Sequence, residues 1–128
     1  MKGNSLSVIL SAHLTQYSSV ENKYRHELLT SMIYDLGLSY AVVQGVYKGV
    51  SEVSILVKLN SFADLEILKN YAFKNFGQES VLFNDYNGMS HLMYNDGKDE
   101  MLGKLQPVAS IVGLDAYTIV NGQAWAVA

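Results

Sequence analysis

The chain has 128 residues, a formal net charge of −3 and a pI near 5.5; 49% of its residues are hydrophobic and 16% are charged. This composition suits one compact domain over residues 1–128 and excludes an intrinsically disordered chain. Lys and Arg are scattered, which argues against nucleic-acid binding, and the lack of cysteine excludes disulfides and thiolate metal sites. The first residues lack the features of a signal peptide, so we expect a cytoplasmic protein.

Apolar and polar side chains alternate from Leu6 to Leu14, which predicts a first strand. Ser18 and Glu21 have the spacing of a capping box, so we expect a helix to begin there and to end at Gly37. Apolar residues recur in it at helical spacing: Val20, Tyr24, Leu28, Met32 and Leu36.

Residues 40–60 predict two strands joined by a tight turn at residues 48–49, with Tyr47 on one side of the turn and Glu52 on the other. Alternation assigns one face of the second strand to the core: Val53, Ile55, Val57 and Leu59. Glu52 therefore points away from the core. A carboxylate there is either a solvated edge charge or a group that meets a cationic ligand.

Ser61 and Asp64 predict the start of a second helix, which ends at Gly77. Its predicted buried stripe is Phe62, Leu65, Leu68, Ala72 and Phe76. Strands are predicted at residues 80–85 and 89–94. The resulting order is β-α-β-β-α-β with an added strand. It predicts an α+β, ferredoxin-like split β-α-β sandwich, with both helices on one face of an antiparallel sheet.

The C-terminal part has weaker signals. Residues 98–115 contain the only proline, Pro107, and we expect them to be irregular, as either a lid or a long surface loop. A final hairpin is predicted at residues 117–128, turning at Asn121-Gly122.

A ferredoxin-like sheet leaves its second face without helices. The residues predicted on that face are Ile9, Val42 or Val43, and Leu56, among Ser7, Ser11 and Ser54. Because this face is too apolar to remain wet, we expect another copy of the chain to cover it, with sites in the clefts between subunits.

Few residues point to a specific chemistry. The three histidines lack metal-ligand spacing, so we expect no metal site. No nucleophile elbow, phosphate-binding glycine loop or thiol is present, which disfavours covalent and phosphoryl-transfer chemistry. Gln78 and Glu79 follow the second helix and are either a polar loop or partners of Tyr47 and Glu52. In the second case, two carboxylates without an arginine favour a positively charged ligand.

Six features of the chain, taken in order, resemble the phage-encoded S-adenosylmethionine hydrolase family, whose members are now understood as S-adenosylmethionine lyases. They cover nearly the whole chain: VILSA in the first strand, Asn22 with Arg25-His26 in the first helix, GVYKG at the hairpin, FGQESVL from Phe76, GMSHLMY from Gly88, and the closing YTI, Gly122 and WAV.

The resemblance implies site residues in two groups: Tyr47 and Glu52 as catalytic residues, and Gln78 and Glu79 as substrate-binding residues. Ser11 and His13, at the end of the first strand, are our candidates for the adenine side of the site. Relatives have a longer connection between the tyrosine and the glutamate, whereas four residues separate them here.

The resemblance also implies a homotrimer that binds S-adenosylmethionine between neighbouring subunits and cleaves it to methylthioadenosine and homoserine lactone, without a cofactor. This depletion would protect phage DNA from restriction systems that need S-adenosylmethionine. Attack by the substrate's own carboxylate needs no proton transfer, whereas attack by water needs a general base such as Glu52 or Glu79. Two alternatives fit the same features: a trimeric metabolite-binding protein without turnover, and an interaction protein whose open sheet face binds a host partner.

Overall fold

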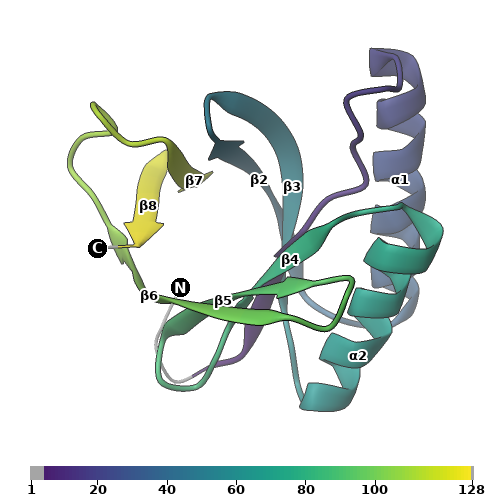
Figure 1. Cartoon of the computed structure of the whole chain (residues 1–128). Helices are drawn as coiled ribbons and strands as arrows, with labels where there is room; N and C mark the ends of the chain where they lie inside the picture. Colours follow the sequence, from purple (N-terminus) through teal and green to yellow (C-terminus); the bar gives the residue numbers. More distant parts are fainter. Residues whose placement is uncertain (1–4, 128) are drawn as a thin grey trace.

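The computed structural model describes residues 5–127 (Figure 1). The strands are β1 (Ser7–Leu10), β2 (Tyr40–Tyr47), β3 (Val50–Lys58), β4 (Ser80–Asn84), β5 (Met89–Tyr94), β6 (Asp99–Pro107), β7 (Ala116–Val120) and β8 (Gln123–Val127). The helices are α1 (Ser19–Asp35) and α2 (Phe62–Asn70), and the π-helical turn η1 (Tyr71–Asn75) continues α2. In the part of the chain that the structure describes, neither helix is long and apolar enough to cross a membrane.

The eight strands form one closed antiparallel barrel in the order β1-β3-β2-β7-β8-β6-β5-β4. The predicted ferredoxin-like split sandwich is therefore wrong, because that fold has an open sheet with two free edges. Here β2 pairs with β7 from Gln44 opposite Ile119 to Tyr47 opposite Ala116, and β4 pairs with β5. The C-terminal strands thus use the backbone hydrogen-bonding groups that the edges would leave unpaired.

Both helices lie on the same side of the barrel and cover one face of β1, β3 and β4 (Figure 1). The core fills the layer between them and includes Val8, Leu10, Leu29, Ile33, Ile55, Val57, Leu65, Leu68, Val81 and Phe83. The predicted core face of the second hairpin strand is confirmed for Ile55, Val57 and Leu59, which are all buried. Burial of these side chains stabilises the helix-covered half of the barrel.

The second face of the same strands lines the inside of the barrel. Ile9 and Val43 are 8% and 4% exposed within the single chain. Inward-facing polar groups bond to one another: Ser90 Oγ donates to Asn84 Oδ1 at 2.6 Å, and Asn84 Nδ2 donates to Ser7 Oγ at 3.0 Å. The expectation that another copy covers this face is therefore wrong, because strands of the same chain enclose it.

The predicted first helix is present, and its capping box is confirmed by the bond from Glu21 N to Ser18 Oγ at 3.1 Å. It buries Leu29 and Ile33 rather than the whole predicted stripe. Three residues of that stripe are exposed: Val20 (77%), Tyr24 (68%) and Leu28 (45%). The helix face that packs against the sheet is shifted by one residue from the predicted face, from Leu28 to Leu29.

In the second helix the predicted stripe is buried except for one residue. Leu65, Leu68, Ala72 and Phe76 are at most 2% exposed, whereas Phe62 is 56% exposed. Phe62 occupies the first position of α2, and its ring contacts those of Phe83 and Tyr86 at the edge of the core.

The prediction that residues 98–115 are irregular is wrong for their first half, because residues 99–107 form β6 and pair with β5 and β8. Pro107 is the last residue of this strand, a position where its missing N–H does not interrupt the ladder. The loop that remains, residues 108–115, connects β6 to β7. The predicted turn at Lys48-Gly49 is confirmed; positive φ values of 50° and 79° give it the geometry of a tight hairpin turn.

His91 on β5 lies between two carboxylates. Its Nε2 is 2.9 Å from Asp85 Oδ2, and its Nδ1 is 2.9 Å from Asp99 Oδ1. Burial alone lowers the pKa of His91, but the hydrogen bonds to Asp85 and Asp99 outweigh burial and hold the pKa above 6.5. The charged imidazole therefore joins the β4–β5 turn to the start of β6.

We predict that His91 stabilises the protein most below pH 6.5. A group with a raised pKa in the folded state contributes its full stability below the unfolded pKa, near 6.5, and loses it as the pH rises through the folded value. The difference in unfolding free energy between the wild type and His91→Gln, measured in urea at pH 6 and pH 9, should be larger at pH 6. An equal difference at both pH values would contradict the ion-pair interpretation.

Candidate functional site

The antiparallel order gathers the strand ends into two rims. At one rim β1, β2, β5 and β8 end and β3, β4, β6 and β7 begin. We call it the Tyr47 rim. All the residues predicted for the site lie at or next to strand ends of this rim: Ser11 and His13 after β1, Tyr47 at the end of β2, Glu52 near the start of β3, and Gln78 and Glu79 before β4.

Tyr47 and Glu52 come from the two arms of the β2–β3 hairpin and lie on its inward face. Glu52 is opposite Gly45 and Tyr47 is opposite Val50, on the same face as the buried Val43. Gly45 has no side chain, and a Cβ at this position would lie 3.4 Å from Ser54 Oγ, so Ser54 already occupies part of the space beside Glu52. Within residues 5–127 the half-buried Glu52 carboxylate makes no hydrogen bond or ion pair, so it is free to meet a ligand.

Ser11, His13 and Gln78 are joined by hydrogen bonds. Ser11 Oγ donates to Val53 O at 2.9 Å and accepts from His13 N at 3.0 Å, and Gln78 Nε2 donates to His13 O at 2.9 Å. The Ser11 bond attaches the segment that follows β1 to strand β3, next to Glu52. The Gln78 bond attaches the same segment to the residues that precede β4. The Gln78 side chain is buried and its amide nitrogen bonds to the backbone, so its first role is to build the rim.

The segment after β1 is also held from α1. Arg25, the only arginine in the chain, donates from Nε to Ala12 O at 2.8 Å and from Nη2 to Phe76 O at 2.5 Å. Asn22 bonds to both backbone groups of Leu14. The only guanidinium is thus bound to backbone carbonyls of the rim, and its position there is structural.

Glu79 is exposed, and its backbone carbonyl accepts a hydrogen bond from Asn95 N at 2.9 Å. This bond places the start of β4 beside the β5–β6 turn. The structure therefore brings the predicted residues into two groups at one rim, the hairpin pair of Tyr47 and Glu52 and the bonded group around Gln78.

Negative charges outnumber positive charges at the strand ends of this rim. The carboxylates are Glu52, Glu79, Asp96, Asp99, Glu100 and Asp115, of which Asp99 is paired with His91, and the ammonium groups are Lys48 and Lys98. Lys48 Nζ lies 5.2 Å from the centroid of the Tyr47 ring, so one face of this ring attracts a cation. Such a rim attracts a positively charged ligand and repels an anion.

Tyr94 and Glu100 reach the same rim from β5 and β6. Tyr94 is part of the sequence resemblance only as the last residue of GMSHLMY, without a predicted site role, and no local pattern marks Glu100. Their proximity to Tyr47 follows only from closure of the barrel, which the predicted open sheet lacks.

His26 lies behind the rim, with its ring edge-on to that of His13 at a centroid distance of 5.9 Å. Burial lowers the pKa of His26 below 6.5, the nearby His13 lowers it further, and Glu27 opposes this shift. The imidazole is therefore neutral at pH 7. It also lines a shallow pocket of about 360 Å³ between α1 and β2, shared with Glu27, Thr30, Ser31, Tyr34, Tyr40 and Val42.

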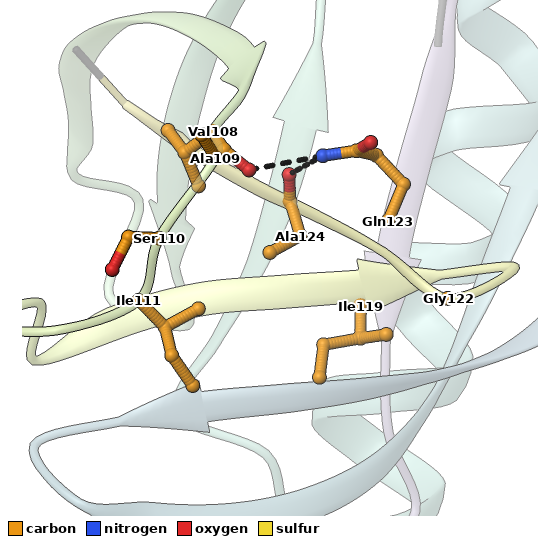
Figure 2. Close-up of a pocket in the computed structure, with 8 residues that line it drawn as sticks. All are labelled: Val108, Ala109, Ser110, Ile111, Ile119, Gly122, Gln123 and Ala124. Atoms are coloured by element: carbon orange, nitrogen blue, oxygen red, sulfur yellow. Dashed lines mark hydrogen bonds between the residues drawn. The ribbon is translucent and has the colours of Figure 1, made fainter.

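A larger cavity of about 540 Å³ lies near the other end of β7 and β8, under the loop after β6 (Figure 2). Its lining is Val108, Ala109, Ser110, Ile111, Ile119, Gly122, Gln123 and Ala124. Gln123 Nε2 donates to the carbonyls of Val108 and Ala124, both at 3.0 Å. The lining carries no ionisable side chain, so it offers neither charge stabilisation nor acid–base chemistry, and the Tyr47 rim is the better candidate site.

One comparison identifies relatives of this chain. A family model described as the S-Adenosylmethionine lyase family matches residues 8–128, nearly the whole chain. No protein of curated function matches it.

We predict that Gln78→Glu destabilises the fold. The change keeps the shape of the side chain but replaces the Nε2 donor with an acceptor that faces the carbonyls of His13 and Phe76. The free energy of unfolding in urea should fall by about 1–3 kcal/mol. The adjacent, exposed Glu79→Gln is the control and should leave the unfolding midpoint unchanged. Equal midpoints for both variants would show that the Gln78 bonds are dispensable.

Proposed function

The chain belongs to the S-adenosylmethionine lyase family, and on this premise we propose that it cleaves S-adenosylmethionine at the Tyr47 rim into methylthioadenosine and homoserine lactone. Family membership implies cleavage of S-adenosylmethionine; the products, the site and the residue roles are our proposal. The observation that carries it is the convergence of Tyr47, Glu52, Gln78 and Glu79 at one acidic rim. We propose that residues 1–128 act as one cleaving domain.

The reaction needs little from the protein. The substrate's own carboxylate oxygen attacks its γ-carbon, the bond from that carbon to sulfur breaks, and the electron pair moves to sulfur. The products are a neutral thioether, methylthioadenosine, and a protonated amino lactone, and no water is consumed. Because attack joins a carboxylate to the carbon beside a sulfonium, charge is neutralised, and a site with little water accelerates the step.

Glu52 and Tyr47 have the properties that this reaction requires. The unpaired, inward-facing Glu52 carboxylate attracts the sulfonium or the α-ammonium group and holds the folded-back conformer. The Tyr47 ring and hydroxyl contact the methionyl part. Neither residue transfers a proton in this reaction. Ser11 and His13 lie on the adenine side, with Gln78 and Glu79 between the two ends of the substrate.

We propose a homotrimer in which a neighbouring chain completes the site. Tyr47 is 56% exposed, so the rim is open on its outer side. A group of exposed apolar side chains is available for contact between subunits: Val20, Tyr24, Leu28, Tyr34 and Val42. In a phage-infected cell, depletion of S-adenosylmethionine in the host cytoplasm would disable restriction systems that use it, which is the biological role that we propose.

The trimer predicts a light-scattering mass of three times the 14.2 kDa chain. Leu28→Glu places a charge in the apolar group and should lower this mass, because burial of an unpaired charge opposes association. Lys74→Glu, an exposed change to the same residue type on η1, should leave the mass unchanged. A wild-type mass of one chain at micromolar concentration would exclude the trimer.

We predict that Glu52→Gln reduces turnover by about 100-fold or more, because the group that holds the substrate in its folded-back, reactive conformer is lost. Chromatography of S-adenosylmethionine incubated with each protein measures methylthioadenosine and the four-carbon product. Homoserine lactone should appear before homoserine, which forms from it by hydrolysis.

Glu66→Gln, an exposed change of the same kind on α2, is the matched control and should retain wild-type turnover. If homoserine appears first, water is the nucleophile and Glu52 or Glu79 acts as its base. If wild-type protein binds the substrate and leaves it intact, the chain is a binding protein and the proposed activity is wrong.

A further inference from the structure

Tyr94 lies on the wall of the barrel opposite Tyr47. In the ring of eight strands, β2 and β5 are four positions apart, which makes them opposite walls. Both strands end at the same rim, with Tyr47 and Tyr94 as their last residues. An eight-stranded barrel has an interior just wide enough for side chains or one small ligand, so two inward phenols from opposite walls approach each other.

The inward direction of Tyr94 follows from the register of β5. Alternation places it on the same face as Leu92 and Ser90, and Ser90 is fully buried and bonds to Asn84 inside the barrel. Glu100 on β6 lies opposite Leu92 and therefore shares this face. Tyr94 and Glu100 are thus neighbours on one inner wall, at the rim where Tyr47 and Glu52 form the other.

The electrostatics of Tyr94 support this arrangement. Burial raises the pKa of its phenol above 10.0, and the nearby Glu100, Tyr47 and Asp96 raise it further, while Lys48 opposes them. The two tyrosines are therefore close enough to interact, although they lie 47 positions apart in the chain. Within residues 5–127, neither the Tyr94 hydroxyl nor the Glu100 carboxylate has a hydrogen-bond or ion-pair partner, so both remain available to a ligand.

We propose that Tyr94 and Glu100 form the far wall of the substrate site, where Tyr94 contacts the substrate opposite Tyr47 and Glu100 selects its positive charge. This inference rests on the proposed function, in which S-adenosylmethionine binds at the Tyr47 rim. Two aromatic rings and two carboxylates around one opening provide a cage for a sulfonium, because ring faces and carboxylates both attract a cation. The neutral product loses this attraction, which favours its release.

The test compares a sulfonium with a neutral thioether. The substrate supplies the first, and its demethylated analogue, the same molecule without the methyl group and the positive charge, supplies the second. We measure kcat/KM for S-adenosylmethionine and the inhibition constant of the analogue. For Glu100→Gln we expect kcat/KM to fall roughly threefold to tenfold, while the inhibition constant of the analogue stays within about twofold.

Tyr94→Phe should weaken both ligands by roughly threefold to tenfold, because the hydroxyl contact is lost for each. The matched controls are Glu66→Gln and Tyr86→Phe; Tyr86 is exposed on the β4–β5 turn at the opposite end of the barrel. Glu100→Asp is a second variant at this exposed position, and it should restore most of the discrimination in favour of the sulfonium.

The outcomes distinguish the proposed cleavage of S-adenosylmethionine from the proposed role of Tyr94 and Glu100 in binding it. If the wild type cleaves S-adenosylmethionine and Glu52→Gln reduces this activity while Glu100→Gln and Tyr94→Phe behave like their controls, the far wall is elsewhere and only this inference is overturned. If Glu100→Gln weakens both ligands equally, Glu100 does not select charge. If the wild type neither binds nor cleaves the substrate, the proposed function and the inference both fail.

Discussion

Pairing of β2 with β7 determines most of what this molecule can do. Without it the sheet ends at β2, its inner face is open, and Tyr47 lies on an edge strand. With it the ring closes, and strict antiparallel order sends alternate strand ends to one rim. Backbone pairing alone then brings residues that are distant in sequence to the same rim. The position of the candidate site is therefore a consequence of backbone pairing, and side-chain chemistry acts within it.

Local signals predicted the elements well, and long-range pairing accounts for the errors. The capping box at Ser18 and the positive-φ turn at Lys48-Gly49 are short-range features, and both were predicted. The order of helices and strands up to residue 94 was also correct. That order is compatible with an open sheet, and nothing within β6 shows that it pairs with β8, because a half-exposed strand with scattered polar residues lacks a clear alternation. One unrecognised strand thus changed the predicted fold.

The residues of the candidate site also divide into those that the sequence indicates and those that only long-range strand pairing brings together. Sequence resemblance named Tyr47, Glu52, Gln78 and Glu79, and the barrel brings these residues to one rim. It gave no site role to Tyr94 or Glu100, whose place at the rim depends on closure of the barrel. The structure also separates side chains that bind backbone groups of the rim from a carboxylate that has no partner. Arg25 and the amide of Gln78 bind backbone carbonyls, whereas Glu52 has no partner within residues 5–127. The only guanidinium is used in the scaffold, and carboxylates outnumber ammonium groups at the opening.

Burial is distributed unevenly around the barrel. The apolar core lies between the helices and β1, β3 and β4, and all its residues fall between Leu6 and Phe83. The strands that complete the ring, β6, β7 and β8, contribute few buried side chains, so ladder hydrogen bonds hold them with little apolar support. Such segments open locally at a lower free energy than the rest of a protein. A ligand that contacts both the β2–β3 hairpin and β6 would link the helix-covered half of the barrel to the half with few buried side chains. Its binding would therefore slow amide hydrogen exchange in β6, β7 and β8.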